Sequence, residues 1–106
     1  MKRSDEELVR DALEHIAKLR RHLSRSSLDD ETVADAVSLR LAAAIESVSE
    51  TSDEFRKRTF GSDWKIIWAT RNRIAHGYAY IDLAIIRDTV EQDLLEFERR
   101  LTDAIN

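Results

Sequence analysis

Residues that break helices are almost missing from this chain, whose 106 residues include no proline and only two glycines, Gly61 and Gly77. Alanine, leucine, glutamate and arginine, which favour helices, are abundant instead. Glycine is the usual residue just past the end of a helix, so the two glycines mark places where helices stop. This composition predicts an all-α fold.

Apolar residues recur at steps of three or four along the chain, which is the spacing of an amphipathic helix. The first helix begins at Ser4, where Glu7 completes a capping box, and its pattern ends near Ser24. The last helix is capped by Asp82 and has the cleanest pattern. Its expected core residues are Leu83, Ile86, Val90, Leu94, Phe97, Leu101 and Ile105.

A second helix is expected to begin at Asp29 and to run to about Arg58, bent or broken by the serines and threonine between residues 47 and 52. Gly61 ends this segment and Ser62 caps the next helix. Short connections then produce an antiparallel four-helix bundle, with a short extra helix before the third long helix if the second is broken. We expect a single domain covering residues 1–106.

Charge and composition exclude several classes of protein. The formal net charge of −4 argues against a protein that coats nucleic acid, although cations gather between Arg56 and Arg73. Arg56, Lys57 and Arg58 belong either to an RNA-binding face or to a solvated helix end. The lack of cysteine excludes disulfides. Without a membrane-spanning apolar run or a signal peptide, we expect a soluble cytoplasmic protein that contacts no membrane.

The segment from Trp64 to Tyr78 holds both tryptophans and one of the glycines. On a helix, one arginine shares a face with the apolar residues of the segment: Trp64, Ile67, Trp68, Arg71, Ile74 and Ala75. A charge in the middle of an apolar face is costly unless another group pairs with it. Because Gly77 ends the helix, we expect His76 at the helix end and Tyr78 in the outgoing chain.

Two interpretations of this helix end remain open from the residues alone. In one, Arg71, Asn72, His76 and Tyr78 form a polar site. In the other, Arg71 extends past the tryptophans to water, His76 caps the last carbonyl groups, and Tyr78 is an ordinary half-buried aromatic residue.

The segment Arg71-Asn72-Arg-Ile-Ala-His76-Gly77-Tyr78 resembles the Arg-x4-His-x-Tyr signature of the HEPN superfamily, and specifically of its HepT-like toxins. The polar residue after the arginine, Asn72, also belongs to that pattern. The segments before and after the motif are similar to the family as well. The similarity is clear from about Asp53 to the C-terminus and mainly architectural before it.

The resemblance implies a metal-independent endoribonuclease that acts as a toxin of a type VII-like toxin–antitoxin system. Such cleavage needs a group that moves protons and a cation that holds the phosphate. Histidine exchanges protons near neutral pH and arginine contacts phosphate at two points, so His76 and Arg71 suit these roles. Asn72 would orient His76 or touch the ribose. No metal or cofactor is expected, and the weaker candidates for RNA binding are Arg73, Lys65 and Arg58.

Two partners besides RNA follow from the resemblance. A homodimer would set two Arg71/His76 pairs across one cleft, and the second apolar side formed by Ile66/Trp68 and Ile85/Leu95 also suggests burial against another subunit. The other partner is a minimal nucleotidyltransferase antitoxin (MntA-like) that adenylylates Tyr78. The added charge and bulk would repel RNA phosphate beside His76.

Two alternatives belong to other functional classes. The same bundle would serve as a non-catalytic helical nucleotide-binding partner of a nucleotidyltransferase, with Arg71 only holding a phosphate. It would also serve as a dimeric scaffold, with Arg71 in a structural ion pair. RNA cleavage by the isolated protein separates the ribonuclease from both alternatives.

Overall fold

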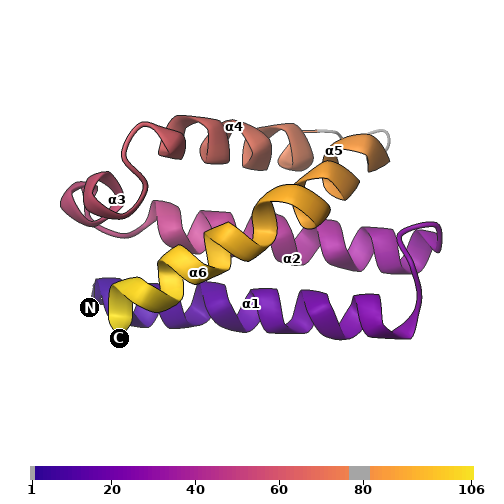
Figure 1. Ribbon diagram of the computed structural model, residues 1–106, viewed down its shortest axis with the longest axis horizontal. Coiled ribbons are helices and arrows are strands. Elements are labelled where there is room, and N and C mark those ends of the chain that lie inside the picture. Colours follow the sequence, from indigo (N-terminus) through magenta and orange to yellow (C-terminus); the bar gives the residue numbers. More distant parts are fainter. Residues whose placement is uncertain (1, 77–81) are drawn as a thin grey trace.

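The computed structural model describes residues 2–76 and 82–106, and the regular elements within them are all helical (Figure 1). They are α1 (Asp5–Arg25), α2 (Glu31–Ser49), α3 (Asp53–Phe60), α4 (Asp63–Ala75), α5 (Leu83–Asp88), the π-helical turn η1 (Thr89–Asp93) and α6 (Leu94–Ile105). The long helices alternate in direction, which confirms the antiparallel bundle, and α3 is the short extra helix (Figure 1). Within the described ranges, no helix is both long and apolar enough to cross a membrane.

Side chains cap the predicted helix starts, with two corrections. Ser62 precedes α4, but its backbone is already helical and its side chain makes no capping hydrogen bond, so the prediction that it caps this helix is wrong. Ser4 accepts a hydrogen bond from the backbone N–H of Glu7 at 3.1 Å, and the Glu7 carboxylate accepts from the backbone N–H of Ser4. Asp82 caps α5 as expected. The prediction that Asp29 caps the second helix is wrong, because Asp30 accepts from the first N–H groups of α2. The Asp29 carboxylate instead pairs with Arg87 of α5 at 3.1 Å.

The second helix breaks after Ser49, which confirms the predicted interruption between residues 47 and 52, and a separate helix, α3, begins at Asp53. Ser52 caps α3, and its own backbone N–H and hydroxyl each donate to the Asp5 carboxylate at 2.8 Å. These bonds hold Ser52 in an extended conformation, so the helical path is interrupted there. The bond from the Ser52 backbone lowers the pKa of Asp5. Gly61 then ends α3 with a φ of 57°, a conformation that favours glycine.

The core is built mainly from α1, α2 and α6, while α4 lies on the outside of the bundle. The largest fully buried side chains are Val9, Ile16, Leu19, Val37, Leu41, Val48, Ile86, Leu94 and Leu101. The predicted pattern of the last helix fails at Leu83, which is 40% exposed because α5 begins at the end of the bundle (Figure 1). No residue of α4 is fully buried. Its two tryptophans, Ile67 and Ile74 pack against the core and are only partly buried, while Ile66 is exposed, so one side of α4 is left to solvent.

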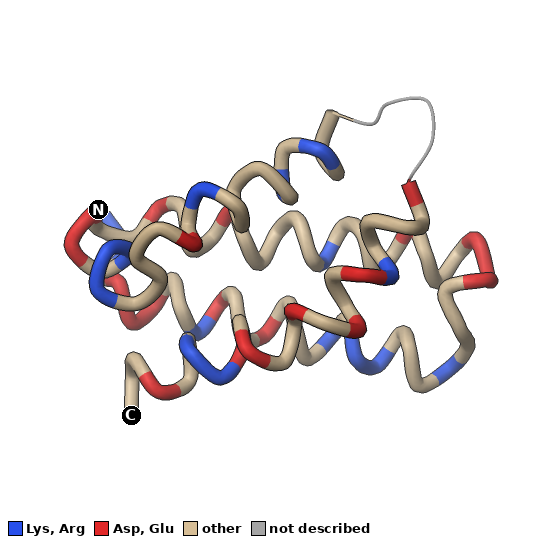
Figure 2. The backbone as a smooth tube through the Cα atoms, turned by 45° about the horizontal axis from the view of Figure 1, so that its top comes forward, with Lys and Arg blue, Asp and Glu red and all other residues tan. Residues whose placement is uncertain are grey.

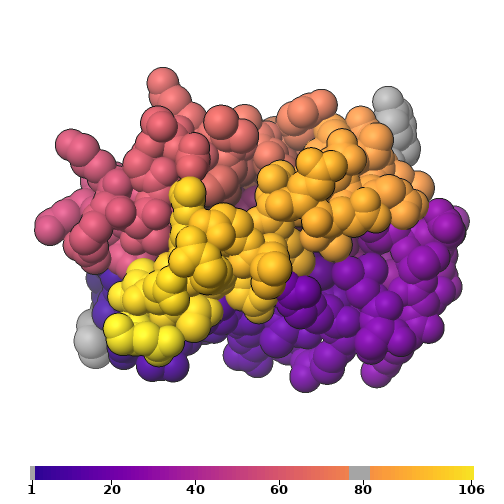
Figure 3. Space-filling model, in the orientation of Figure 1, coloured from indigo at the N-terminus to yellow at the C-terminus, as the bar shows by residue number. Residues whose placement is uncertain are grey.

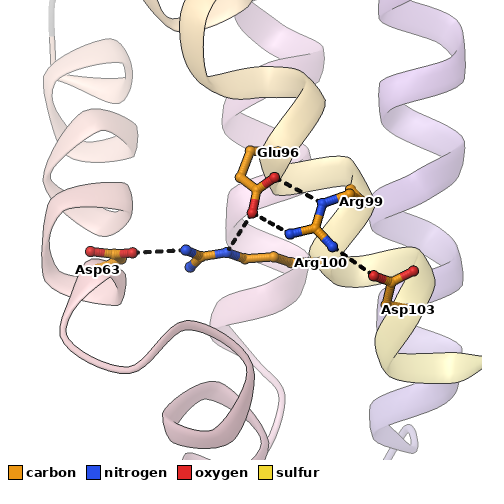
Figure 4. Close-up of polar contacts among 5 residues, drawn as sticks. All are labelled: Asp63, Glu96, Arg99, Arg100 and Asp103. Atoms are coloured by element: carbon orange, nitrogen blue, oxygen red, sulfur yellow. Dashed lines mark hydrogen bonds and ion pairs between the residues drawn. The ribbon is translucent and has the colours of Figure 1, made fainter.

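An ion-pair network links the beginning of α4 to α6 (Figure 4). Arg100 donates to Asp63 of α4 at 3.1 Å and to Glu96 at 3.3 Å. Arg99 donates to Glu96 at 2.9 Å and to Asp103 at 2.8 Å, and its hydrogen bond lowers the pKa of Glu96. Figure 3 shows α6 crossing one face of the molecule between α4 and α1. The network therefore connects α4, the outer helix, to α6.

Candidate active site

The face of α4 that meets the core carries aromatic rings one helical turn apart. The rings of Trp64 and Trp68 stack with their centroids 6.0 Å apart, and Phe60 lies 6.0 Å from Trp64. The guanidinium of Arg71 lies over the Trp68 ring at 4.9 Å, which is the geometry of a cation–π contact. The predicted helix face that Arg71 shares with apolar residues is therefore confirmed. The guanidinium of Arg71 packs on the Trp68 ring and does not extend past the tryptophans to water.

Among the described residues, the Arg71 side chain donates hydrogen bonds to two others. Its Nη2 donates to the Glu46 carboxylate of α2 at 2.8 Å, and its Nη1 donates to the Asn72 side-chain oxygen at 3.2 Å. The Nε atom is buried and has no hydrogen-bond acceptor among the described residues. The side chain of Arg71 is 19% exposed and that of Glu46 is 55% exposed. Pairing with Glu46 thus offsets part of the cost of placing a charge on an apolar face.

Sequence reasoning missed Glu46. The signal was present, because Glu46 is the one carboxylate in the otherwise small and apolar run from Leu41 to Ser49. What the sequence did not show is which helix this run of α2 contacts. Contact between α2 and α4 brings residues 46 and 71 together.

His76 occupies the C-cap of α4, as predicted, and its side chain is exposed. Its backbone N–H donates to the carbonyl of Asn72 at 3.0 Å. Asn72 therefore contacts both Arg71 and His76, the first through its side chain and the second through its backbone carbonyl. Gly77 and Tyr78 lie outside the described residues, so the role of Tyr78 stays a prediction.

The cations around the motif fall into two groups. Arg56 is structural: it donates to the Ser49 carbonyl at 2.9 Å and also contacts the Thr51 carbonyl and the Asp53 carboxylate. Arg58 is 64% exposed beside Glu54, and Lys65 and Arg73 are exposed on α4. With three cations and one carboxylate, α4 is locally basic in an acidic chain, and the charge colours along α4 can be followed in Figure 2.

Among residues 2–76 and 82–106, no group of three or more histidine, aspartate or glutamate side chains is arranged to hold a metal ion. The residues at this helix end that can carry chemistry are a stacked arginine, an amide and an exposed histidine. The guanidinium can contact an anion and the imidazole can transfer a proton, and no hydrogen bond joins these two side chains among the described residues.

The fold and this site define a helical-bundle protein that carries an arginine–histidine motif at the end of an outer helix. The chain belongs to the HepT-like family of the HEPN superfamily, because the family model described as Ribonuclease HepT-like matches residues 9–104. The comparisons found no match among curated proteins or solved structures. Membership supports a HEPN ribonuclease toxin at the level of the family.

Proposed function

We propose that this protein is a metal-independent endoribonuclease that acts as a toxin of a type VII-like toxin–antitoxin system. The observation that carries the proposal is the Arg71 guanidinium, stacked on Trp68 at 4.9 Å, on the same helix whose end bears the exposed His76. Matching of residues 9–104 to a ribonuclease family supports the same class of reaction.

The proposed reaction is attack of a ribose 2′-oxygen on the neighbouring phosphorus. The bond from phosphorus to the 5′-oxygen breaks, which leaves a 2′,3′-cyclic phosphate and a 5′-hydroxyl. His76 removes the 2′-hydroxyl proton or protonates the leaving 5′-oxygen, as general acid–base catalysis requires. Arg71 stabilises the negative charge on the phosphorane. Asn72 positions Arg71 through its side chain and the helix end through its carbonyl.

We propose a homodimer as the active form, because one histidine per site would otherwise have to serve as both acid and base. Ile66 of α4 is 68% exposed and Leu95 of α6 is 73% exposed. Ile66 also lines a groove of about 290 Å³ between α4 and α6, whose floor includes Phe60, Ile67 and Phe97 and whose lining also includes the charged Asp63, Glu96 and Arg100. Burial of Ile66 and the apolar part of this groove by a second copy would remove exposed apolar area from water. Such a dimer would supply a second histidine to the site.

We propose that the remaining cations of the motif region bind other phosphates of the RNA, at a distance from the phosphate that reacts. Lys65 and Arg73 lie exposed on α4, and Arg58 is exposed on α3. Single exposed cations of this kind add affinity through the phosphate backbone and read no sequence.

We further propose that a nucleotidyltransferase antitoxin neutralises the protein by adenylylating Tyr78. Tyr78 follows His76 by two residues, so an added nucleotide would lie near the imidazole. Its negative charge and bulk would oppose the binding of an RNA phosphate.

Cleavage of single-stranded RNA by the purified protein tests the proposed function. We expect His76→Ala and Arg71→Ala to lose cleavage while their circular dichroism stays helical, since no residue of α4 is fully buried. The pairing of Arg71 with Glu46 also fits a scaffold with a structural ion pair. Unchanged cleavage in both variants would reject the ribonuclease site. If the wild type cleaves no RNA but is labelled with ATP by a nucleotidyltransferase, the non-catalytic partner is the better description.

A further inference from the structure

The five N–H groups of Arg71 are not equally accessible. The Nε atom is buried, so an incoming anion cannot reach that edge of the guanidinium without a rearrangement. The Nη1 and Nη2 atoms form the other edge, where Asn72 accepts at 3.2 Å and Glu46 accepts at 2.8 Å. An anion that takes two hydrogen bonds from Arg71 must therefore approach the edge that Glu46 already contacts.

A phosphate and the Glu46 carboxylate cannot both sit favourably on this edge. Each carries a negative charge, and two like charges at contact distance repel each other. The two partners of the ion pair also differ in freedom: Glu46 is 55% exposed, whereas Arg71 is 19% exposed and rests on Trp68. Glu46 can turn into water while Arg71 stays in place.

We propose that Glu46 is a regulatory residue of the site, which occupies Arg71 in the RNA-free protein and leaves when a phosphate of the substrate binds. This inference rests on the proposed function, in which Arg71 contacts the phosphate. Glu46 then sets the threshold for substrate binding: it keeps the half-buried Arg71 paired without RNA, and it lowers the affinity of this edge for any competing anion.

Glu46→Gln tests the exchange, because glutamine keeps the size and the acceptor oxygen but removes the competing charge. The matched control is Glu50→Gln, which makes the same charge change one helical turn along at an exposed position. The probe is a fluorescein-labelled single-stranded 2′-O-methyl oligoribonucleotide, in which the attacking 2′-hydroxyl is blocked. We expect Glu46→Gln to bind this oligonucleotide about fivefold more tightly than the wild type, because a partly exposed ion pair contributes an effect of that size. The affinity of Glu50→Gln should stay within about twofold of the wild type. Equal or weaker binding by Glu46→Gln than by Glu50→Gln would overturn the proposal and make Glu46 a positioning residue.

A second measurement separates failure of this inference from failure of the ribonuclease proposal. The side-chain N–H signals of Arg71 are followed by NMR during titration with inorganic phosphate, and Arg71→Lys identifies them by their loss. We expect these signals to respond at about fivefold lower phosphate in Glu46→Gln than in the wild type. Identical titrations would reject the exchange even if RNA is cleaved. The expected shift together with no RNA cleavage would keep the exchange and reject the ribonuclease.

Discussion

Replacing Arg71 with lysine keeps the positive charge and removes the planar fork, so it tests whether geometry or charge matters at this position. Lysine cannot contact Glu46 and Asn72 with the geometry that the two Nη atoms of Arg71 provide. It also loses the flat stacking of the guanidinium on Trp68 at 4.9 Å. The two losses act on different quantities, namely the stability of the fold and the rate of RNA cleavage.

The expected loss of stability is small. A cation–π contact at an exposed site contributes about 0.5–1 kcal/mol, and an exposed ion pair contributes about 0.2–1 kcal/mol, part of which lysine retains. A total of about 1 kcal/mol lowers the Tm of a domain of this size by about 4–8 °C. The expected loss of activity is larger. One charged hydrogen bond to the phosphate is worth about 1.5–3 kcal/mol, which lowers kcat/KM by about 10- to 150-fold.

The assay combines kcat/KM on a fluorogenic RNA oligonucleotide with thermal unfolding followed by circular dichroism. Arg20→Lys is the matched control, because Arg20 pairs with Glu98 at 2.7 Å at a site on α1 and α6 without a proposed role in RNA cleavage. We expect the control to change stability on the same small scale and to leave kcat/KM within about twofold. If Arg71→Lys cleaves RNA as fast as the control, charge alone suffices and the bidentate role of Arg71 is wrong.

Three further predictions concern the dimer, the modification and the pH dependence of stability. Ile66→Glu is expected to convert a dimer of about 25 kDa, twice the chain mass of 12.3 kDa, into a monomer by light scattering, whereas a monomeric wild type at micromolar concentration would contradict the composite site. Tyr78→Phe should retain most RNA cleavage but resist neutralisation by the nucleotidyltransferase with ATP; intact mass would show added AMP on the wild type only, and equal labelling of the variant would place the modification elsewhere. Burial, with help from Arg40, lowers the pKa of His15 below its ordinary value of 6.5, so the unfolded chain binds the proton more tightly. The contribution of neutral His15 to the free energy of unfolding is then complete above about pH 6.5, and it is lost as the pH drops from there through the pKa of the folded state. Denaturant unfolding at several pH values should show this slope in the wild type and a flatter slope in His15→Gln. Parallel slopes would contradict the prediction.

Local patterns were enough to predict most of the helices. Ser4 and Glu7 are three residues apart, so their capping box depends only on the chain near them. The choice between Asp29 and Asp30 as a cap was different, because both residues suit the role. Asp29 forms an ion pair with Arg87, which lies 58 positions further along the chain, so the sequence near Asp29 could not predict that contact.

For the candidate site too, the features that depend on nearby residues were predictable from the sequence, and the contact between distant residues was not. The position of Arg71 among apolar residues and of His76 at the helix end followed from helical periodicity and Gly77. The partner that Arg71 requires did not follow, because Glu46 lies on another helix and 25 positions away. Periodicity showed that a paired charge was needed there, while only the packing of α2 against α4 showed which residue supplies it.

The most direct test of the central claim is the identification of the product ends formed from a defined single-stranded RNA in the presence of EDTA. If His76 and Arg71 catalyse attack by the 2′-oxygen, the wild type will yield 2′,3′-cyclic phosphate and 5′-hydroxyl ends at the same rate with and without EDTA. His76→Ala will be slower by about 10² to 10⁴, the usual cost of losing a general acid–base group. Full inhibition by EDTA, or wild-type cleavage by His76→Ala, would contradict the account.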